Sequence, residues 1–179
     1  MGQALPGFET PAVGFETPYE MLAACHERVQ RSLELLGRLL DYVGKNGHDA
    51  QTRSAAADVL RYFDLAAPLH HQDEELHVFP LLLAQGDAAL REQVLQLQAE
   101  HRQMEALWAT LRQPLLRWRE DGATESVNAT LRETAARFAR LYAGHIPNEE
   151  SLVFPAARAA MSEATQAGMG AEMQARRRG

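Results

Sequence analysis

The stretch that decides the fold is Leu69–Pro80, which reads LHHQDEELHVFP. Its pattern, His-x-x-x-Glu-Glu-x-x-x-Phe-Pro, returns in His145–Pro155, which reads HIPNEESLVFP. The two copies lie 75 residues apart, and the same offset links His26 to His101. This repetition predicts a duplicated helical hairpin. In each copy a single histidine lies on the first helix, and a His-x-x-x-Glu pair lies on the second.

Apolar residues around these motifs recur at alternating spacings of four and three, which places them on one face of a helix. The first such face comprises Leu22, His26, Val29, Leu33, Leu36, Leu40 and Val43. Similar faces run through residues 56–74, 90–118 and 127–152. Four helical segments joined by short turns predict an all-α fold, an antiparallel up-down-up-down four-helix bundle. No segment alternates with the period of two that is typical of a strand.

The same patterns divide the chain into three parts. Residues 1–17 are rich in Gly and Pro and predict an N-terminal arm, residues 18–160 form the bundle, and residues 161–179 form a partly helical C-terminal tail. Thr17 is placed to cap the first helix, with Glu20 completing a capping box.

Prolines and glycines predict local breaks. Pro68 falls inside the second helical segment, where a proline kinks a helix or loosens a turn. A short fifth helix is expected after Pro155, reaching about Gln166. Gly168 and Gly170 are expected to interrupt the helix there.

Composition narrows the class of protein. The net charge of -6 argues against non-specific binding to nucleic acid, and Arg176–Arg178 is too short a basic run to reverse this. A single cysteine, Cys25, excludes an internal disulfide. No apolar run reaches the length of a membrane span, and the N-terminus lacks the features of a signal peptide. A cytoplasmic protein without membrane partners is expected.

Six polar residues fall on the apolar helix faces and therefore point into the predicted core. They are His26, His70, Glu74, His101, His145 and Glu149. A buried glutamate is costly unless it is paired or bound to a metal. In a helical hairpin, two residues at equal distances from the turn lie at the same height. The predicted turns fall next to the midpoint between His26 and His70 and next to the midpoint between His101 and His145. All six residues are therefore expected at one level of the bundle.

This set of side chains predicts a metal site. A histidine and a glutamate four residues apart share a helix face, so both can bind one ion while the glutamate reaches a second. Two such pairs and two single histidines can hold two ions bridged by two carboxylates, with an open position for a ligand such as O2 or NO. Mixed imidazole and carboxylate ligands suit iron, manganese or zinc. A metal-free layer of His–Glu hydrogen bonds and a single structural zinc are the alternatives.

Neighbouring polar residues are weaker candidates. Glu105 lies four residues after His101 and is a candidate further ligand. The others are expected mainly to orient ligands or to lie outside the site: Glu75, Glu100, Glu150, His71 and His77. His48 lies at a turn, about 30 Å along the helix from His26, and is not expected to bind metal. Cys25 is expected to be a small buried thiol.

The order of these motifs resembles the hemerythrin-like family, the HHE cation-binding domains, from about Tyr19 to Pro155. The resemblance implies an antiparallel four-helix bundle with a non-heme di-iron centre, bridged by carboxylates and by an oxo or hydroxo group. Carried over to this sequence, Glu74 and Glu149 are the bridging carboxylates. The implied ligand set is His26, His70, Glu74, His101, His145 and Glu149.

Two departures separate the chain from hemerythrin proper, the oxygen carrier. That protein has His-x-x-x-His on its third helix, where this chain has Glu105 at the second histidine position. On the fourth helix of hemerythrin proper, the carboxylate ligand lies five residues after the histidine. In this chain Glu149 lies four residues after His145. The ligand set is more similar to bacterial hemerythrin-like proteins, to the iron-sensing ubiquitin-ligase domain and to iron–sulfur cluster repair proteins.

The expected function is therefore that of a cytoplasmic di-iron protein. It would bind or sense O2, NO or peroxide, or would handle iron. The alternative is an enzyme that consumes peroxide or NO, or an iron donor for cluster repair. A zinc-stabilised structural bundle is a third class.

Overall fold

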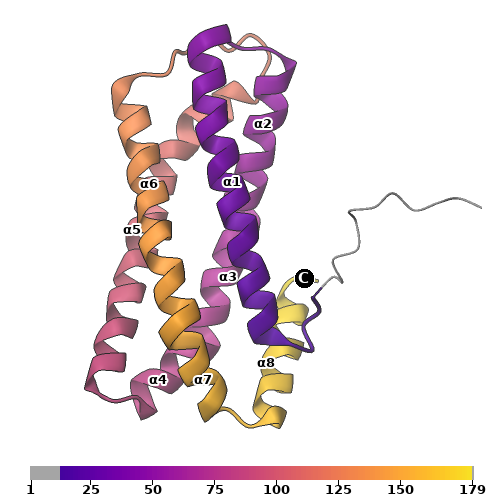
Figure 1. Cartoon of the computed structure of the whole chain (residues 1–179). Coiled ribbons are helices and arrows are strands. Elements are labelled where there is room, and N and C mark those ends of the chain that lie inside the picture. The colour runs from indigo at the N-terminus through magenta and orange to yellow at the C-terminus, as the bar shows by residue number, and fades with distance from the viewer. Residues whose placement is uncertain (1–12, 179) are drawn as a thin grey trace, which may run out of the picture.

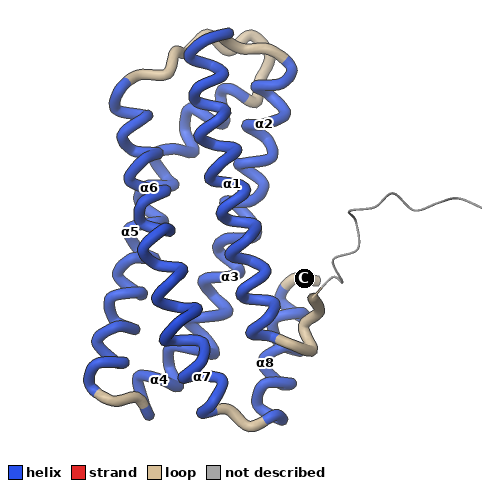
Figure 2. Tube along the Cα trace, in the orientation of Figure 1, coloured by secondary structure: helices blue, strands red, loops and turns tan. Residues whose placement is uncertain are grey.

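The computed structural model describes residues 13–178, which form a bundle of helices (Figure 1). The first hairpin contains the long helix α1 (Pro18–Asn46), then α2 (Ala50–Arg61), the π-helix η1 (Tyr62–Ala66), α3 (Ala67–Asp73), the π-helix η2 (Glu74–Val78) and α4 (Phe79–Gln85). The second contains the long helix α5 (Ala88–Trp118), α6 (Ala129–Asn148), the π-helix η3 (Glu149–Val153) and α7 (Phe154–Ala160), and α8 (Glu163–Arg176) follows. Figure 2 shows helices and loops but no strand within this part of the chain, as predicted.

Polar side chains define where several helices begin. The Asp49 side chain accepts hydrogen bonds from the backbone of Gln51 and Thr52, forming a capping box at the start of α2. The capping box predicted at Thr17 is wrong. Thr17 lies outside the backbone region of an N-cap, and its hydroxyl donates to the Gly14 carbonyl instead. Glu20, the expected second member, pairs with Arg158 at 2.7 Å.

Each of the three π-helices ends two residues before a proline: Pro68, Pro80 or Pro155. A proline ring clashes with the carbonyl four residues earlier, and a wider turn relieves that clash. In each case the residue before the proline donates its N–H to a carbonyl five residues back, as Phe79 does to Glu74. The loosened turn predicted at Pro68 is confirmed. Two of the π-helices begin at the glutamates of the repeated motif, Glu74 and Glu149.

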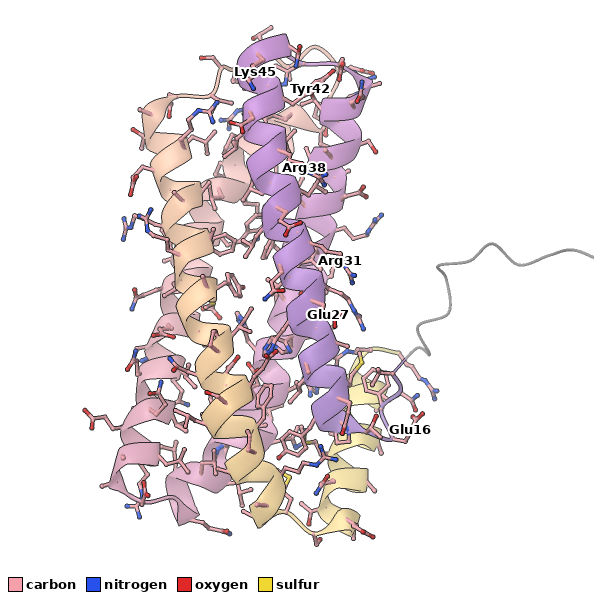
Figure 3. The ribbon with its side chains drawn as sticks, viewed as in Figure 1. Glu16, Glu27, Arg31, Arg38, Tyr42 and Lys45 are labelled. Atoms are coloured by element: carbon pink, nitrogen blue, oxygen red, sulfur yellow. The ribbon has the colours of Figure 1, made fainter. Side chains whose placement is uncertain are left out.

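The apolar core lies in two clusters, one on each side of the level that holds the repeated histidines. The cluster towards the α1–α2 turn includes Phe63, Leu111, Trp118 and Phe138, and the opposite cluster includes Leu22, Phe79, Leu97, Val153 and Phe154. Figure 3 labels Glu27, Arg31 and Arg38 along the outward face of α1, opposite its buried residues. Within residues 13–178, no helix has both the length and the apolar character needed to cross a membrane.

The helix break near the C-terminus lies earlier than predicted, because α7 ends at Ala160 and not near Gln166. The arm expected over residues 1–17 falls mainly on residues 1–12, which lie outside the described part. The tail, however, forms the continuous helix α8, which packs beside the N-terminal end of α1 (Figure 1). The helix break falls at Met161 and Ser162, because the Ser162 hydroxyl caps α8 by accepting from the Thr165 backbone. The two glycines expected to interrupt a helix, Gly168 and Gly170, lie inside it.

Gly170 is required where α8 passes against the chain before α1. A Cβ atom added at Gly170 would lie 1.8 Å from the Phe15 carbonyl oxygen, whereas one added at Gly168 would meet no atom within 4 Å in residues 13–178. Alanine improves helix propensity by about 1 kcal/mol at either position. We therefore expect Gly168→Ala to raise the free energy of unfolding by up to about 1 kcal/mol and Gly170→Ala to lower it. Urea unfolding of the two variants measures the difference, and stabilisation by both would contradict the Phe15 contact.

Candidate metal centre

The six residues predicted for the site meet in the core from both hairpins. Each of these residues is at most 4% exposed, and both glutamates are fully buried. α1 supplies His26, α3 supplies His70, α5 supplies His101 and α6 supplies His145. Glu74 and Glu149 are the first residues of η2 and η3. The π-helices therefore begin at the site itself, which is where such turns are often found in proteins.

The donor atoms form two overlapping clusters that share both glutamates. His26, His70, Glu74 and Glu149 offer atoms that all lie within 4.8 Å of one another, and so do Glu74, His101, His145 and Glu149. We refer to these as the His26/His70 position and the His101/His145 position.

Each glutamate directs one carboxylate oxygen to each position. Glu74 Oε1 lies 3.2 Å from His70 Nε2, while its Oε2 lies 3.3 Å from His101 Nε2. Glu149 Oε2 lies 3.1 Å from His26 Nε2, while its Oε1 lies 2.9 Å from His145 Nε2. This is the arrangement that two bridging carboxylates require.

The polar atoms at the centre fit cations better than they fit one another. Both oxygens of Glu74, both oxygens of Glu149 and the Nε2 atom of His26 are buried without an aligned hydrogen-bond partner among the described residues. Burying carboxylates in this way is costly unless a cation compensates their charge. Imidazole and carboxylate donors are suitable ligands for iron, manganese or zinc. The geometry therefore favours a metal site over a metal-free layer of His–Glu hydrogen bonds.

Three carboxylates orient the histidine rings from behind. His26 Nδ1 donates to Glu150 at 2.8 Å, His101 Nδ1 to Glu75 at 3.0 Å and His145 Nδ1 to Glu100 at 2.8 Å. Such a bond fixes the ring and makes the opposite nitrogen, Nε2, a stronger donor to a metal. Glu75 and Glu150, the second glutamates of the two Glu-Glu pairs, therefore differ in role from Glu74 and Glu149, because each orients a histidine of another helix.

The Phe-Pro end of each motif also contributes to the site. Phe79 stacks on His101 with ring centroids 5.4 Å apart, and Phe154 stacks on His26 at 5.5 Å. His71 covers His101 as well, with centroids 4.0 Å apart. These aromatic contacts restrict the rotation of the single histidines on α1 and α5.

The weaker candidates lie outside the two clusters. Glu105 is exposed and borders a small cavity, and His77 pairs with Glu172 of α8. His48 Nε2 interacts with the Glu125 carbonyl at 2.7 Å, far along the chain from either motif. Cys25 is a buried free thiol.

One polar cluster beside the site was missed in the sequence. Asp73 is fully buried immediately before Glu74, and its carboxylate accepts hydrogen bonds from Arg176 and Arg177 at 2.5 Å each. The only signal was the position of an aspartate within the core-facing motif. Its partners are more than 100 residues away, in a segment whose charges resemble those of a solvated tail.

Burial and charge shift the protonation of the metal-free site in opposite directions. Burial lowers the pKa of His26 and His101, but the neighbouring carboxylates outweigh it, with Glu149 raising the pKa of His26 to about 9 and Glu74 raising that of His101 to about 10. Burial lowers the pKa of His70, as does the charge of His26. Burial and the charge of Glu149 raise the pKa of Glu74 to about 7. Protons therefore occupy part of this site when metal does not.

These pKa shifts predict how stability depends on pH. A histidine whose pKa is raised in the folded protein stabilises the metal-free fold, and this contribution is complete below the unfolded pKa of 6.5. It is lost as the pH rises to the folded pKa, which is about 9 for His26 and about 10 for His101. Each contributes a slope of about 1.4 kcal/mol per pH unit in that interval. Metal binding requires deprotonated ligands and strengthens with pH. The gap in Tm between metal-loaded and metal-free protein should therefore widen from pH 6.5 to 8.5.

Circular dichroism melting at three pH values, with chelator or with excess Mn²⁺ under nitrogen, measures this gap. Metal-free protein that became more stable across the same interval would contradict the protonation of His26 and His101.

Comparison with known proteins agrees with this site. The model of the family described as the Hemerythrin HHE cation binding domain matches residues 17–157. A curated protein of Haemophilus influenzae, described there as an uncharacterized protein, is 34% identical over 160 residues. That alignment covers 89% of this chain and 90% of the relative. The match to the family model spans both motifs and ends before α8.

Proposed function

The chain belongs to the hemerythrin family of HHE cation-binding domains, and we propose that it holds two iron ions in its core. With them it binds or senses a small ligand, O2, NO or peroxide, or handles iron. The observation that carries this proposal is the pair of overlapping donor clusters that share two fully buried glutamates.

In this proposal the ligands are the six buried residues. His26 and His70 would hold one ion, His101 and His145 would hold the other, and Glu74 and Glu149 would bridge them. Manganese or zinc could occupy the same donors, and an oxo or hydroxo bridge completes the iron centre expected from the resemblance. Bound iron supplies redox chemistry and an open coordination position, neither of which the side chains provide.

The surrounding residues prepare the site for a small ligand. Glu75, Glu100 and Glu150 hold three of the imidazole rings, and Phe79 and Phe154 stack on His101 and His26. The four helical segments that carry these residues correspond, in the proposal, to the antiparallel up-down-up-down bundle expected from the sequence. The cytoplasm is the proposed location.

A small apolar cavity beside the site supports the binding of a diatomic molecule. It has a volume of about 50 Å³, and its lining includes Phe63, Trp108, Phe138, Tyr142 and His71. On this measure one water molecule needs roughly 10–15 Å³, so the cavity has room for a molecule of the size of O2 or NO. His71 joins this cavity to the site, because its ring stacks on His101.

A different cavity favours the alternative function, a redox enzyme or an iron donor for cluster repair. It has a volume of about 630 Å³ and is lined by His26 and Glu150, together with Glu20, Glu27 and Arg158. A space of this size can hold molecules much larger than a diatomic ligand beside His26 and Glu150. Exchange of iron or access of a larger reactant would use this route.

Metal analysis and spectroscopy test the proposal. Aerobically purified protein is expected to contain about two irons per chain and to show an absorption band of bridged ferric iron. Reduced protein is then exposed separately to O2, NO and peroxide. A stable adduct reversed by removing the ligand favours binding, whereas continued consumption favours the enzyme. One zinc per chain, or a folded protein without metal that cannot be loaded with iron, would overturn the di-iron proposal.

A further inference from the structure

The duplication allows each residue at the site to be compared with its counterpart 75 residues later. Most pairs match in residue type: His26 with His101, His70 with His145, Glu74 with Glu149, Glu75 with Glu150, and Phe79 with Phe154. The two halves differ in the groups that support the histidines of the His-x-x-x-Glu pairs.

His145 has a carboxylate behind its ring, and His70 does not. His145 Nδ1 donates to Glu100 at 2.8 Å, and Glu100 is itself only 14% exposed. His70 Nδ1 is buried and has no hydrogen-bond partner among the described residues. The counterpart of Glu100 in the first half is Cys25. A thiol is only a weak hydrogen-bond acceptor, and Cys25 makes no hydrogen bond to His70 Nδ1, so it does not replace the carboxylate.

A second difference concerns the packing of the single histidines. His101 is covered by Phe79 on one side and by His71 at 4.0 Å. His26 is stacked on Phe154, but it also lines the cavity of about 630 Å³. The counterpart of His71 in the second half is Ile146, which cannot stack as an imidazole does. The His26/His70 position is therefore less supported, and its His26 borders the larger cavity.

We propose that the two ion positions are inequivalent. The His101/His145 position, with carboxylates on both imidazole rings, binds the first ion tightly, and the His26/His70 position, with one, binds the second ion weakly and exchanges it through the cavity beside His26. A carboxylate partner of a ligating histidine is typically worth about 10- to 100-fold in metal affinity. This inference rests on the proposed function, because it requires two metal positions. It assigns iron exchange to one of them.

The first test is a titration of the metal-free full chain with Mn²⁺ alone. Calorimetry measures the affinity of each step, and electron paramagnetic resonance records the spectrum at each equivalent. We expect two steps that differ by about 10- to 100-fold in affinity. One equivalent should give the spectrum of isolated Mn²⁺, and two equivalents the spectrum of a spin-coupled pair. A coupled pair already dominant at one equivalent, or equal intrinsic affinities, would overturn the inequivalence while leaving the two-metal site intact. Failure to bind two ions would overturn the proposed function itself.

Matched variants assign the steps to positions. His145→Ala should abolish the tight step, whereas His70→Ala, the same change at the counterpart, should leave it and abolish the weak step. Glu100→Gln should weaken the tight step by about 10- to 100-fold, and Glu150→Gln should weaken only the weak step. Glu150 is 47% exposed, so its replacement is compatible with folding. The opposite assignment in either pair would overturn the proposal.

Cys25→Ala is the control for the missing carboxylate. Because the thiol is proposed to be no partner of either position, both steps should keep their affinities. A weakened step in this variant would show that Cys25 supports the site, and the comparison between the halves would then be wrong.

Discussion

Glu149→Gln is expected to empty both ion positions and to lower Tm by roughly 10 to 20 °C in the presence of metal. Glu149 belongs to both donor clusters, with one oxygen 3.1 Å from His26 Nε2 and the other 2.9 Å from His145 Nε2. An amide keeps the shape of the side chain but supplies only one oxygen and no charge. No single histidine substitution removes a donor from both positions, so this change should have the larger effect on metal content.

The expected shift in Tm follows from linkage. An ion present at 100 times its Kd stabilises the folded state by about 2.7 kcal/mol, so two ions contribute about 5 kcal/mol. For a chain of this size each kcal/mol corresponds to about 2–4 °C in Tm. Metal content by elemental analysis and thermal melting with and without chelator measure both effects. With chelator present, the Tm of the wild-type protein should fall to about that of Glu149→Gln, because both proteins then lack bound metal.

His48→Ala is the control for this experiment. His48 interacts with the Glu125 carbonyl and packs beside Trp118, so the variant loses stability locally, yet it should keep two metals per chain. Two metals retained by Glu149→Gln would show that Glu149 is not a bridging ligand.

The convergence of the candidate site was predictable because it depends on local periodicity and on the duplication. Helical spacing places His70 and Glu74 on one face, and equal distances from a turn place His26 and His70 at one height. Both arguments use only positions along the chain. The structure brings these residues together as those arguments require.

The features that escaped prediction depend on contacts between distant segments. The π-helices that begin at Glu74 and Glu149 follow from the prolines six residues later, but helical periodicity cannot distinguish a π-turn from a kink. The glycines of α8 indicated a break, because the close approach of the Phe15 carbonyl to Gly170 is not visible in the sequence. Glu100 was a candidate orienting residue, but its partner, His145, lies 45 residues away and could not be identified.

Replacing both Arg176 and Arg177 by methionine is expected to lower the free energy of unfolding by about 3–5 kcal/mol. Arg176 donates to Oδ1 of Asp73, and Arg177 donates to both of its oxygens. Asp73 is fully buried, whereas the arginine side chains are about one-fifth exposed. Removing the arginines leaves an uncompensated carboxylate in the core, and a buried charge without its partner is strongly destabilising. Urea unfolding measures the loss, and limited proteolysis reports whether α8 detaches from the bundle.

Asp73→Asn should lower the free energy of unfolding by about 1–3 kcal/mol, which is less than the double arginine variant, because the groups left without a partner differ. Arg176 keeps its hydrogen bonds to Glu172, Arg177 keeps its contact with the Met173 carbonyl, and both can reach solvent. Arg178→Met is the matched control, since Arg178 is exposed at the end of the same basic run and should leave stability unchanged. A loss in Arg178→Met about half as large as that in the double arginine variant would mean that the basic run acts through its overall charge. The predicted order instead identifies Asp73, next to the bridging Glu74, as the buried anchor of α8.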